Sequence, residues 1–293
     1  MKQYIAILFI ILYFNPSFGQ KEIEANKNTV VQRFIQGLPE KLIKFNLKDL
    51  QNSKDSIDIR IWQTHTIFTL NYDKSLSSNY KIHTNNNNNN NNNNKPIIST
   101  TSISESLTRN ILDSILDSKL MEIKDDSYRG IDGSFTFIEI STKNKYKIVS
   151  FWSPMNKRNN DCKTVEGNLS MISKTINSEK LINEFKNSLE PGGYRWGMTS
   201  IPIDKFLDTD SVKTDFYIMA EEKIKTTLNI TNKTNRWEYP LTLINNKPAK
   251  IADLNQYSMK DIETFELVNP NNPATTAIYG SRGKNGLIKI ETK

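Results

Sequence analysis

The sequence has almost no cysteine or histidine, the residue types most often used as metal ligands, nucleophiles and general bases. Its only cysteine, Cys162, cannot form an intramolecular disulfide, so the fold must rest on a hydrophobic core. The two histidines, His65 and His83, lie in no HExxH motif, which disfavours a zinc-peptidase site. Asp161 precedes Cys162 and disfavours its thiolate, and this argues against a Cys162 and His65 catalytic pair. We therefore predict no catalytic residue, no metal site and no cofactor.

The chain also lacks a long apolar run after its first residues, so we expect no transmembrane segment in the mature chain. At the start, Lys2 precedes an apolar run at 5–14 and a break with small residues at 15–19. This order is typical of a secretory signal peptide, which we predict for residues 1–19. The run is shorter than the ~20 residues of a membrane-spanning helix, so an uncleaved anchor is the weaker alternative. We expect an exported protein beginning near Gln20, without a lipid-bearing cysteine.

No block of like charges stands out. The 293 residues are 37% hydrophobic and 10% aromatic, which is enough for a core in one or two domains. The formal net charge of +7 is spread along the chain. Because there is no basic helix or aromatic-basic module, the sequence disfavours nucleic-acid binding and favours weak contact with acidic surfaces.

The periodicity of the apolar residues predicts an α+β domain at 50–200, after a polar lead-in segment at 20–49. One short amphipathic helix in the lead-in is expected to end at residues 37–39. Alternating apolar residues at 57–62 and an extended run at 67–72 predict two paired strands.

Helices and a hairpin complete this domain. Apolar residues at helical spacing predict an amphipathic helix at 103–116, and a second one at 178–189 that stops at a Pro-Gly-Gly sequence. Two apolar runs at 135–140 and 146–152, separated by turn residues, predict a β-hairpin. The ten asparagines predict a disordered loop at 84–97, and residues 201–234 are expected to be a linker.

Short polar and aromatic groups in this region have two interpretations. Asp125 with Asp126, and Asp208 with Asp210, could act as carboxylate pairs, but they lack the spacing of a calcium loop and are interpreted as solvated turns. The aromatic residues at 151–154 and 193–197 could form a ligand platform, although capping of a small core is favoured.

Residues 235–293 predict a compact unit made of a strand, a tight turn, a second strand, a short helix, a glycine loop and a last strand. Asn245 and Asn246 tolerate positive φ and form the turn. The other elements are expected at 241–244, 265–268, 273–279, 280–286 and 287–292.

Residues 274–293 read ATTAIYGSRGKNGLIKIETK, which resembles the plug-domain signature of TonB-dependent outer-membrane receptors, most closely the polysaccharide-uptake type. The resemblance implies a small plug-like α/β domain at 235–293, about a fifth of the chain. The residues that carry the plug-like motif are Asp261, Ile262, Glu266, Ala277, Tyr279, Gly280, Arg282, Gly283, Asn285 and Gly286.

The sequence departs from the receptors at several points. Asn245 and Asn246 replace their usual Asp-Gly turn, Asn269-Pro270 replaces a charged pair, and no TonB box is found near residue 20. The chain ends at Lys293 without the barrel that follows a receptor plug. We therefore expect a plug-like fold and an envelope location, but not transport by this chain alone.

The glycines Gly280, Gly283 and Gly286, beside Arg282 and Lys284, also suggest a phosphate-binding loop. Such loops lead from a strand into the N-terminus of a helix, where free N–H groups face the anion. Here the expected order is reversed, because the glycines follow a helix and enter a strand. They are interpreted as turn formers.

The sequence thus predicts a non-catalytic binding or interaction protein in the periplasm or on the periplasmic face of the outer membrane. Its expected partner is an outer-membrane barrel or another envelope protein. Two alternatives remain: an envelope hydrolase that uses carboxylates of the domain at 50–200, or a truncated TonB-dependent receptor.

Overall fold

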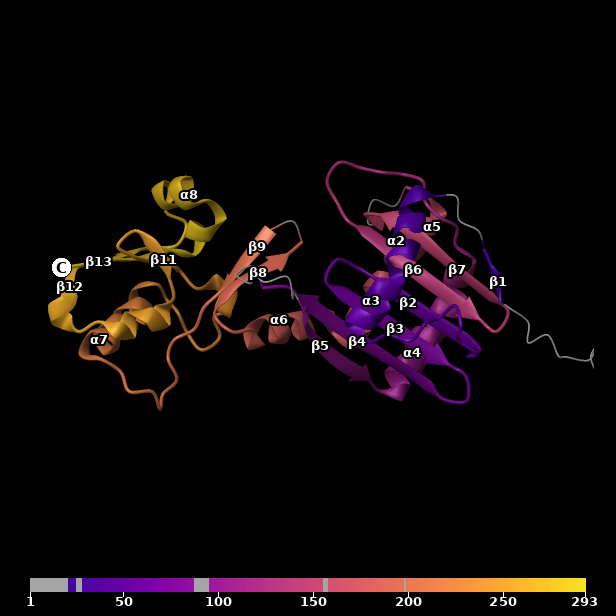
Figure 1. Ribbon diagram of the computed structural model, residues 1–293, viewed down its shortest axis with the longest axis horizontal. Coiled ribbons are helices and arrows are strands. Elements are labelled where there is room, and N and C mark those ends of the chain that lie inside the picture. The colour runs from indigo at the N-terminus through magenta and orange to yellow at the C-terminus, as the bar shows by residue number, and fades with distance from the viewer. Residues whose placement is uncertain (1–20, 25–27, 87–94, 155–157, 198) are drawn as a thin grey trace, which may run out of the picture. The chain divides into compact units, whose positions relative to one another are not determined.

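The structure is a computed structural model that describes residues 21–24, 28–86, 95–154, 158–197 and 199–293 (Figure 1). It has an α+β fold, as predicted, and the chain forms two compact units. The first unit comprises residues 1–81 and 100–176, and the second comprises residues 82–99 and 177–293. The predicted signal peptide lies outside the described residues and stays a prediction. In the described part of the chain, no helix combines the length and the apolar character needed to span a membrane.

A seven-stranded sheet has the strand order β1-β7-β6-β2-β3-β4-β5 (Figure 1). Strand β2 pairs antiparallel with β3 and β6, β6 pairs antiparallel with β7, and β1 pairs parallel with β7. The predicted strand pair and the predicted hairpin are therefore confirmed. The bounds are β1 Glu22–Ile23, β2 Ile57–Trp62, β3 Thr66–Tyr72, β4 Leu76–Thr84, β5 Ile97–Ile103, β6 Phe135–Thr142 and β7 Lys145–Trp152.

Two short helices, α2 (Thr29–Gln36) and α3 (Leu38–Phe45), pack on this sheet (Figure 1). Phe34 stacks on Phe137 with ring centroids 4.1 Å apart, and both Phe34 and Phe45 contact the ring of Trp62. Helix α2 confirms the short amphipathic helix expected to end at residues 37–39, because Gly37 is its C-cap, whereas α3 was not predicted. The chain continues into α3 because a proline is accepted in the first turn of a helix, where its missing N–H has no partner to lose.

Helices α4 (Glu105–Asp117) and α5 (Asn160–Ile176) pack against each other, next to the short 3₁₀ helix η1 (Leu120–Glu122). Helix α4 confirms the amphipathic helix predicted at 103–116, and Ser104 caps it by accepting a hydrogen bond from the Leu107 N–H. The apolar side chains that these helices and the sheet bury include Ile59, Ile61, Ile111, Ile115, Ile138, Ile140, Val165 and Ile172.

An ion pair is enclosed in the first unit. Arg60 on β2 and Glu139 on β6 stand opposite each other in the strand register, and both side chains are 0% exposed. Arg60 Nη1 lies 3.0 Å from Glu139 Oε1, and Arg60 Nη2 donates to the Lys48 carbonyl. Glu139 also accepts hydrogen bonds from Trp62 Nε1 at 2.7 Å and from the Tyr146 hydroxyl at 2.9 Å. The carboxylate is thus held by three donors, two from β2 and one from β7.

The second unit contains a hairpin, a four-stranded sheet of order β11-β10-β13-β12, and three α-helices. The predicted helix at 178–189 is confirmed, and Asn177 caps it. In chain order the elements are α6 Ser178–Ser188, β8 Gly192–Trp196, β9 Thr199–Ile203, α7 Asp215–Thr227, η3 Arg236–Glu238, β10 Leu241–Ile244, β11 Lys247–Ala249, η4 Ile251–Gln256, η5 Met259–Asp261, β12 Ile262–Val268, α8 Pro273–Tyr279, η6 Gly280–Asn285 and β13 Leu287–Thr292.

Residues 201–234 are part of the core of this unit and not the linker that we predicted. Thr214 caps α7 by accepting a hydrogen bond from the Tyr217 N–H, and α7 buries Phe216, Tyr217 and Ile224 completely. These side chains form one apolar cluster with residues that follow α7, among them Ile251, Leu254, Ile288 and Ile290. The apolar positions of α7 recur at helical spacing, but the polar residues around them hid the pattern.

The loop predicted to be disordered at 84–97 is ordered at its first residues. The Thr84 hydroxyl donates to the Arg195 carbonyl, and the Arg195 N–H donates to the Asn85 carbonyl at 3.0 Å. Asn86 forms a β-bridge with Tyr194. Residues 87–94, most of the asparagine run, lie outside the described residues.

Candidate functional site

The plug-like motif begins with a well-capped short helix. The Asn272 side chain accepts a hydrogen bond from the Thr275 N–H at 3.1 Å, and Pro273 occupies the start of α8. The helix ends at Gly280, whose φ of 60° and ψ of −143° suit glycine. The Gly280 N–H donates to the Thr276 carbonyl within the last turn. The glycine loop therefore follows the carbonyl end of a helix, which is not the arrangement of a phosphate-binding loop.

Two glycines allow η6 to fold back tightly against its neighbours. A Cβ atom at Gly283 would lie 2.8 Å from the Thr275 carbonyl oxygen. Gly286 has a φ of 98°, and a Cβ atom there would lie 2.8 Å from the Val268 carbonyl oxygen. Hydrogen bonds from Asn285 Nδ2 to the Trp237 carbonyl and from the Asn271 N–H to the Lys284 carbonyl fix the same connection. These contacts make it a rigid turn.

The outer side of this turn is exposed to solvent. Ile278 is 72% exposed, and Ala277, Arg282 and Lys284 are also exposed. We call these four residues the α8–η6 surface. It combines an apolar side chain with two cations on a fixed backbone.

The other motif residues do not join this surface. The Asp261 carboxylate accepts hydrogen bonds from the Ser258 N–H and hydroxyl, which lower its pKa, and it caps η5. Ile262 pairs with Thr292, at the far end of the β12 and β13 pair from Gly286. Seven strand residues separate the two ends, which corresponds to ~20 Å. Glu266 is exposed in the middle of β12, and Tyr279 is half-buried.

A cavity of about 300 Å³ lies in the second unit, between the β8–β9 hairpin and the β10–β11 region. Its lining mixes apolar and charged side chains. The apolar and aromatic residues include Pro202, Ile203, Tyr239, Pro240, Leu241 and Pro248. The charged residues are Asp204, Arg236, Lys250, Asp253 and Arg282, so the cavity borders the α8–η6 surface at Arg282.

Arg236 is fixed in the cavity wall by backbone acceptors. Its Nε donates to the Asp204 carbonyl at 3.1 Å, and its Nη1 donates to the Asn187 carbonyl at 2.5 Å. Its Nη2 is buried and finds no acceptor among the described residues, and neither does the buried hydroxyl of Thr242 on β10. Within the described part of the chain, carbonyl dipoles and no carboxylate balance the guanidinium charge.

Asp204 is the acid held deepest in this region. Its two carboxylate oxygens accept hydrogen bonds from the Lys205 N–H at 2.8 Å and from the Ile251 N–H at 3.0 Å. Burial raises the pKa of Asp204 to about 6, although both of these N–H groups act in the opposite direction. The cavity is therefore most positive below neutral pH, when this carboxyl is protonated.

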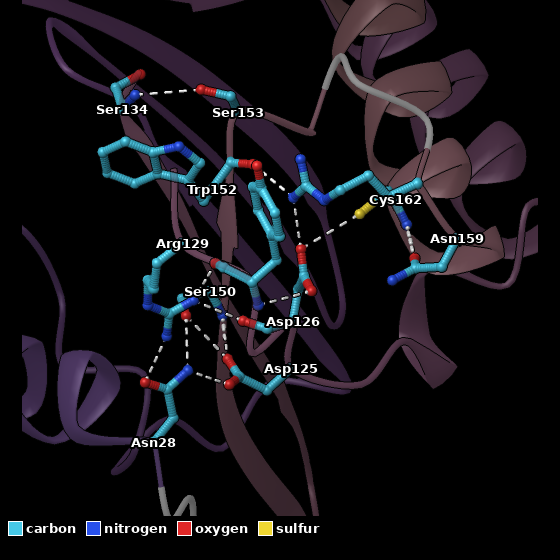
Figure 2. A network of polar contacts seen from close by, with 12 residues as sticks. Asn28, Asp125, Asp126, Arg129, Ser134, Ser150, Trp152, Ser153, Asn159 and Cys162 are labelled. Carbon is cyan, nitrogen blue, oxygen red and sulfur yellow. Dashed lines mark hydrogen bonds and ion pairs between the residues drawn. The ribbon is translucent and has the colours of Figure 1, made fainter. Parts of the chain in front are cut away.

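A second polar cluster lies in the first unit, and Figure 2 shows it. Asp126 is 8% exposed, and its carboxylate accepts from Arg158 Nη2 at 2.7 Å and from the Tyr128 N–H at 3.1 Å. Burial acts to raise the pKa of Asp126, but hydrogen bonds from Arg158, Tyr128 and Cys162 outweigh it and lower this pKa. The interpretation of this acidic pair as a solvated turn was wrong.

Asp125 is used as a structural acceptor in the same cluster (Figure 2). It accepts hydrogen bonds from the N–H and the hydroxyl of Ser150, at 2.6 and 3.0 Å, and one from Asn28. Arg129 links Asn28 to the Asp126 carbonyl. The two carboxylates thus anchor the loop after η1 to α2 and β7. Asp208 and Asp210, in contrast, are exposed as predicted.

Cys162 is buried on α5, with its Sγ 3.5 Å from Asp126 Oδ2 (Figure 2). Burial raises the pKa of the thiol, and the Asp126 carboxylate raises it further. Asp161, which we expected to exert this effect, instead accepts a hydrogen bond from the Lys124 N–H. The contact with Asp126 had no sequence signal because the two residues are far apart in the chain. His65 lies in the connection between β2 and β3.

The aromatic residues at 151–154 and 193–197, which we considered as a ligand platform, include side chains that pack within the protein. Phe151 is buried, and Trp152 packs edge-to-face on Phe135 with ring centroids 4.7 Å apart. A Cβ atom at Gly130 would clash with the Trp152 indole, so the loop covers that ring. Tyr194 is 2% exposed and donates to the Glu190 carbonyl.

The cavity residues were missed at the level of the sequence. Asp204 lies in the segment predicted to be a linker, and Arg236, Lys250 and Arg282 lie far apart in the chain. Only the pairing of β10 with β13 and the packing of the hairpin bring them together. Among the described residues, no three His, Cys, Asp or Glu side chains meet as a metal site requires.

No protein-family model, curated protein or solved structure matches this chain. The geometry and chemistry of its own residues are therefore the basis for assigning a function.

Proposed function

We propose that this protein is a non-catalytic interaction protein of the periplasm or the periplasmic face of the outer membrane. Its second unit would act as a plug-like module that docks on an outer-membrane β-barrel protein. The order strand, short helix, glycine turn and strand supports this proposal, because it is the order predicted for the segment that carries the resemblance. The location rests on the predicted signal peptide.

The observation that carries the proposal is the exposed and rigid α8–η6 surface. Ile278 is 72% exposed although it lies on a capped helix between well-fixed turns. Docking of a rigid surface costs little conformational entropy, and an exposed apolar side chain beside cations provides both burial and orientation. Arg282 and Lys284 would face acidic groups of the partner.

The polar cluster of the first unit favours the interaction protein over the hydrolase alternative. Asp125 and Asp126 accept hydrogen bonds from backbone N–H groups and from the side chains of Arg158, Ser150 and Asn28. A general acid or base must be free to donate a proton to the substrate or to accept one from it. These two carboxylates are committed to holding a loop.

The test is in-cell crosslinking of the full-length protein, followed by affinity purification and identification of the crosslinked proteins by mass spectrometry. Deletion of the C-terminal segment is unsuitable, because it would expose the buried face of α7. We would instead compare the wild type with Ile278→Ser combined with Lys284→Glu. Neither residue lines the cavity or packs in the core. The matched control is Val212→Ser, at an apolar residue of the same unit that is 93% exposed.

We expect the wild type and the Val212→Ser control to recover an outer-membrane barrel protein, and the double variant to lose it by roughly tenfold or more. All three proteins should have the same melting temperature. Equal recovery by the double variant, or no barrel protein with the wild type, would contradict the proposal.

A further inference from the structure

We propose that the cavity of the second unit binds a small ligand that carries an oxyanion, either a carboxylate or a phosphate group. Lys250 and Arg282 would contact the oxyanion, with the fixed charge of Arg236 behind them. This site shares Arg282 with the α8–η6 surface, but Ile278 and Lys284 do not line the cavity.

The charge balance of the wall supports an anionic ligand. Arg236, Lys250 and Arg282 form no ion pair with a carboxylate among the described residues. With Asp204 and Asp253 both ionised, the wall holds three cations against two carboxylates, which leaves an excess of one positive charge. Asp253 accepts from the Lys250 N–H, and both oxygens of Asp204 are covered by backbone N–H groups.

The polar atoms of the wall leave hydrogen-bonding capacity unused. The buried Nη2 of Arg236 has no acceptor among the described residues, and burial of an unpaired charged donor is costly. An oxyanion accepts several hydrogen bonds at once and pairs well with guanidinium and ammonium groups. Arg236 is held by the Asp204 and Asn187 carbonyls, so it would act on a bound anion through its fixed charge.

The size and the apolar lining limit the ligand. A cavity of about 300 Å³ is at the lower end for small-molecule sites, so the ligand has the size of a sugar acid or a sugar phosphate. Tyr239, Pro240 and Pro248 provide flat apolar surface that suits the carbon face of a sugar ring.

Isothermal titration calorimetry with the full-length protein tests the proposal with three probes of similar size: glucuronate, glucose 6-phosphate and glucose. We expect at least one of the anions to bind and glucose not to bind, and the two anions distinguish a carboxylate site from a phosphate site. Lys250→Gln and Arg282→Gln should each weaken binding roughly tenfold.

The control variant is Lys247→Gln on β11, which removes the same charge near the cavity but does not line it. It should leave the affinity unchanged. Absence of anion binding, binding of glucose with equal affinity, or equal losses in the lining and control variants would overturn the proposal. Because the docking test uses Ile278 and Lys284 together, failure of one proposal does not decide the other.

Discussion

The buried pair of Arg60 and Glu139 makes the sharpest prediction about stability. Replacement of Glu139 by glutamine keeps the size of the side chain and an oxygen acceptor for Trp62, but removes the negative charge. Arg60 is then left as a charge at a side chain that is 0% exposed, with a carbonyl as its other partner. We expect Glu139→Gln to destabilise the first unit strongly.

The magnitude follows from the burial of both charges. Removal of one partner of a buried ion pair costs about 3–5 kcal/mol, because the remaining charge has lost its water and its counterion. The exposed pair of Glu105 and Arg109, with side chains 68% and 54% exposed, gives the contrast. Its i,i+4 geometry on α4 is worth about 0.3–0.5 kcal/mol. Glu105→Gln is therefore the matched control.

Hydrogen exchange measured by mass spectrometry on peptides of β2 and β6 is the suitable assay, because it reports on the first unit alone. A loss of about 3–5 kcal/mol accelerates exchange through unfolding by roughly a hundredfold to several thousandfold. Glu105→Gln should change the rate by no more than about threefold. If Glu139→Gln changes the rate as little as this control, the ion pair does not stabilise the unit and our reasoning is refuted.

Three further predictions concern other parts of the chain. Gly283→Ala should lower the free energy of unfolding by about 1–3 kcal/mol, because the new Cβ meets the Thr275 backbone. Gly167→Ala, at a position with open space in α5, should raise the free energy of unfolding by up to about 1 kcal/mol. Thermal melting of both variants tests this prediction. The buried Cys162 thiol, whose pKa is raised, should react with Ellman's reagent slowly in the native protein and rapidly in urea, and fast native reaction would contradict its burial. The folded-state pKa of Asp204 is raised from 3.8 to about 6, so its protonated form favours folding. Up to about 3 kcal/mol of stability should be present below pH ~4 and lost as the pH rises through ~6. In urea titrations, the free energy of unfolding of Asp204→Asn should not show this dependence on pH.

The regular elements could be predicted where one apolar period dominates the sequence. The alternation at 57–62 and the helical spacing at 103–116 each correspond to a real element, and the strand, helix, glycine turn and strand of the C-terminal segment appear in the predicted order. Asn245 and Asn246 adopt φ angles of 50° and 60°, as their turn required.

The errors came from features that depend on tertiary packing. The sequence of α7 looks polar by itself, and its apolar side chains are recognised only in the folded unit, where they pack against Ile288 and Ile290. Asp126 was predicted to be solvated because its partners Arg158 and Cys162 lie much later in the sequence and contact it only in the folded structure. The cavity has no sequence signal, because its cations come from separate elements and no fixed spacing relates them.

The hydrogen bonds of Thr84 and Asn85 to Arg195 have a consequence for the evolution of the gene. They fix one end of the connection that carries the asparagine run, and the other end of this connection leads into β5 at Ile97. For the disordered loop that the sequence predicts beyond this fixed end, a doubling of loop length costs only about 0.6 kcal/mol of closure entropy. Alleles with shorter or longer asparagine runs should therefore encode equally well-folded proteins, and the run is a suitable position for inserting a reporter peptide.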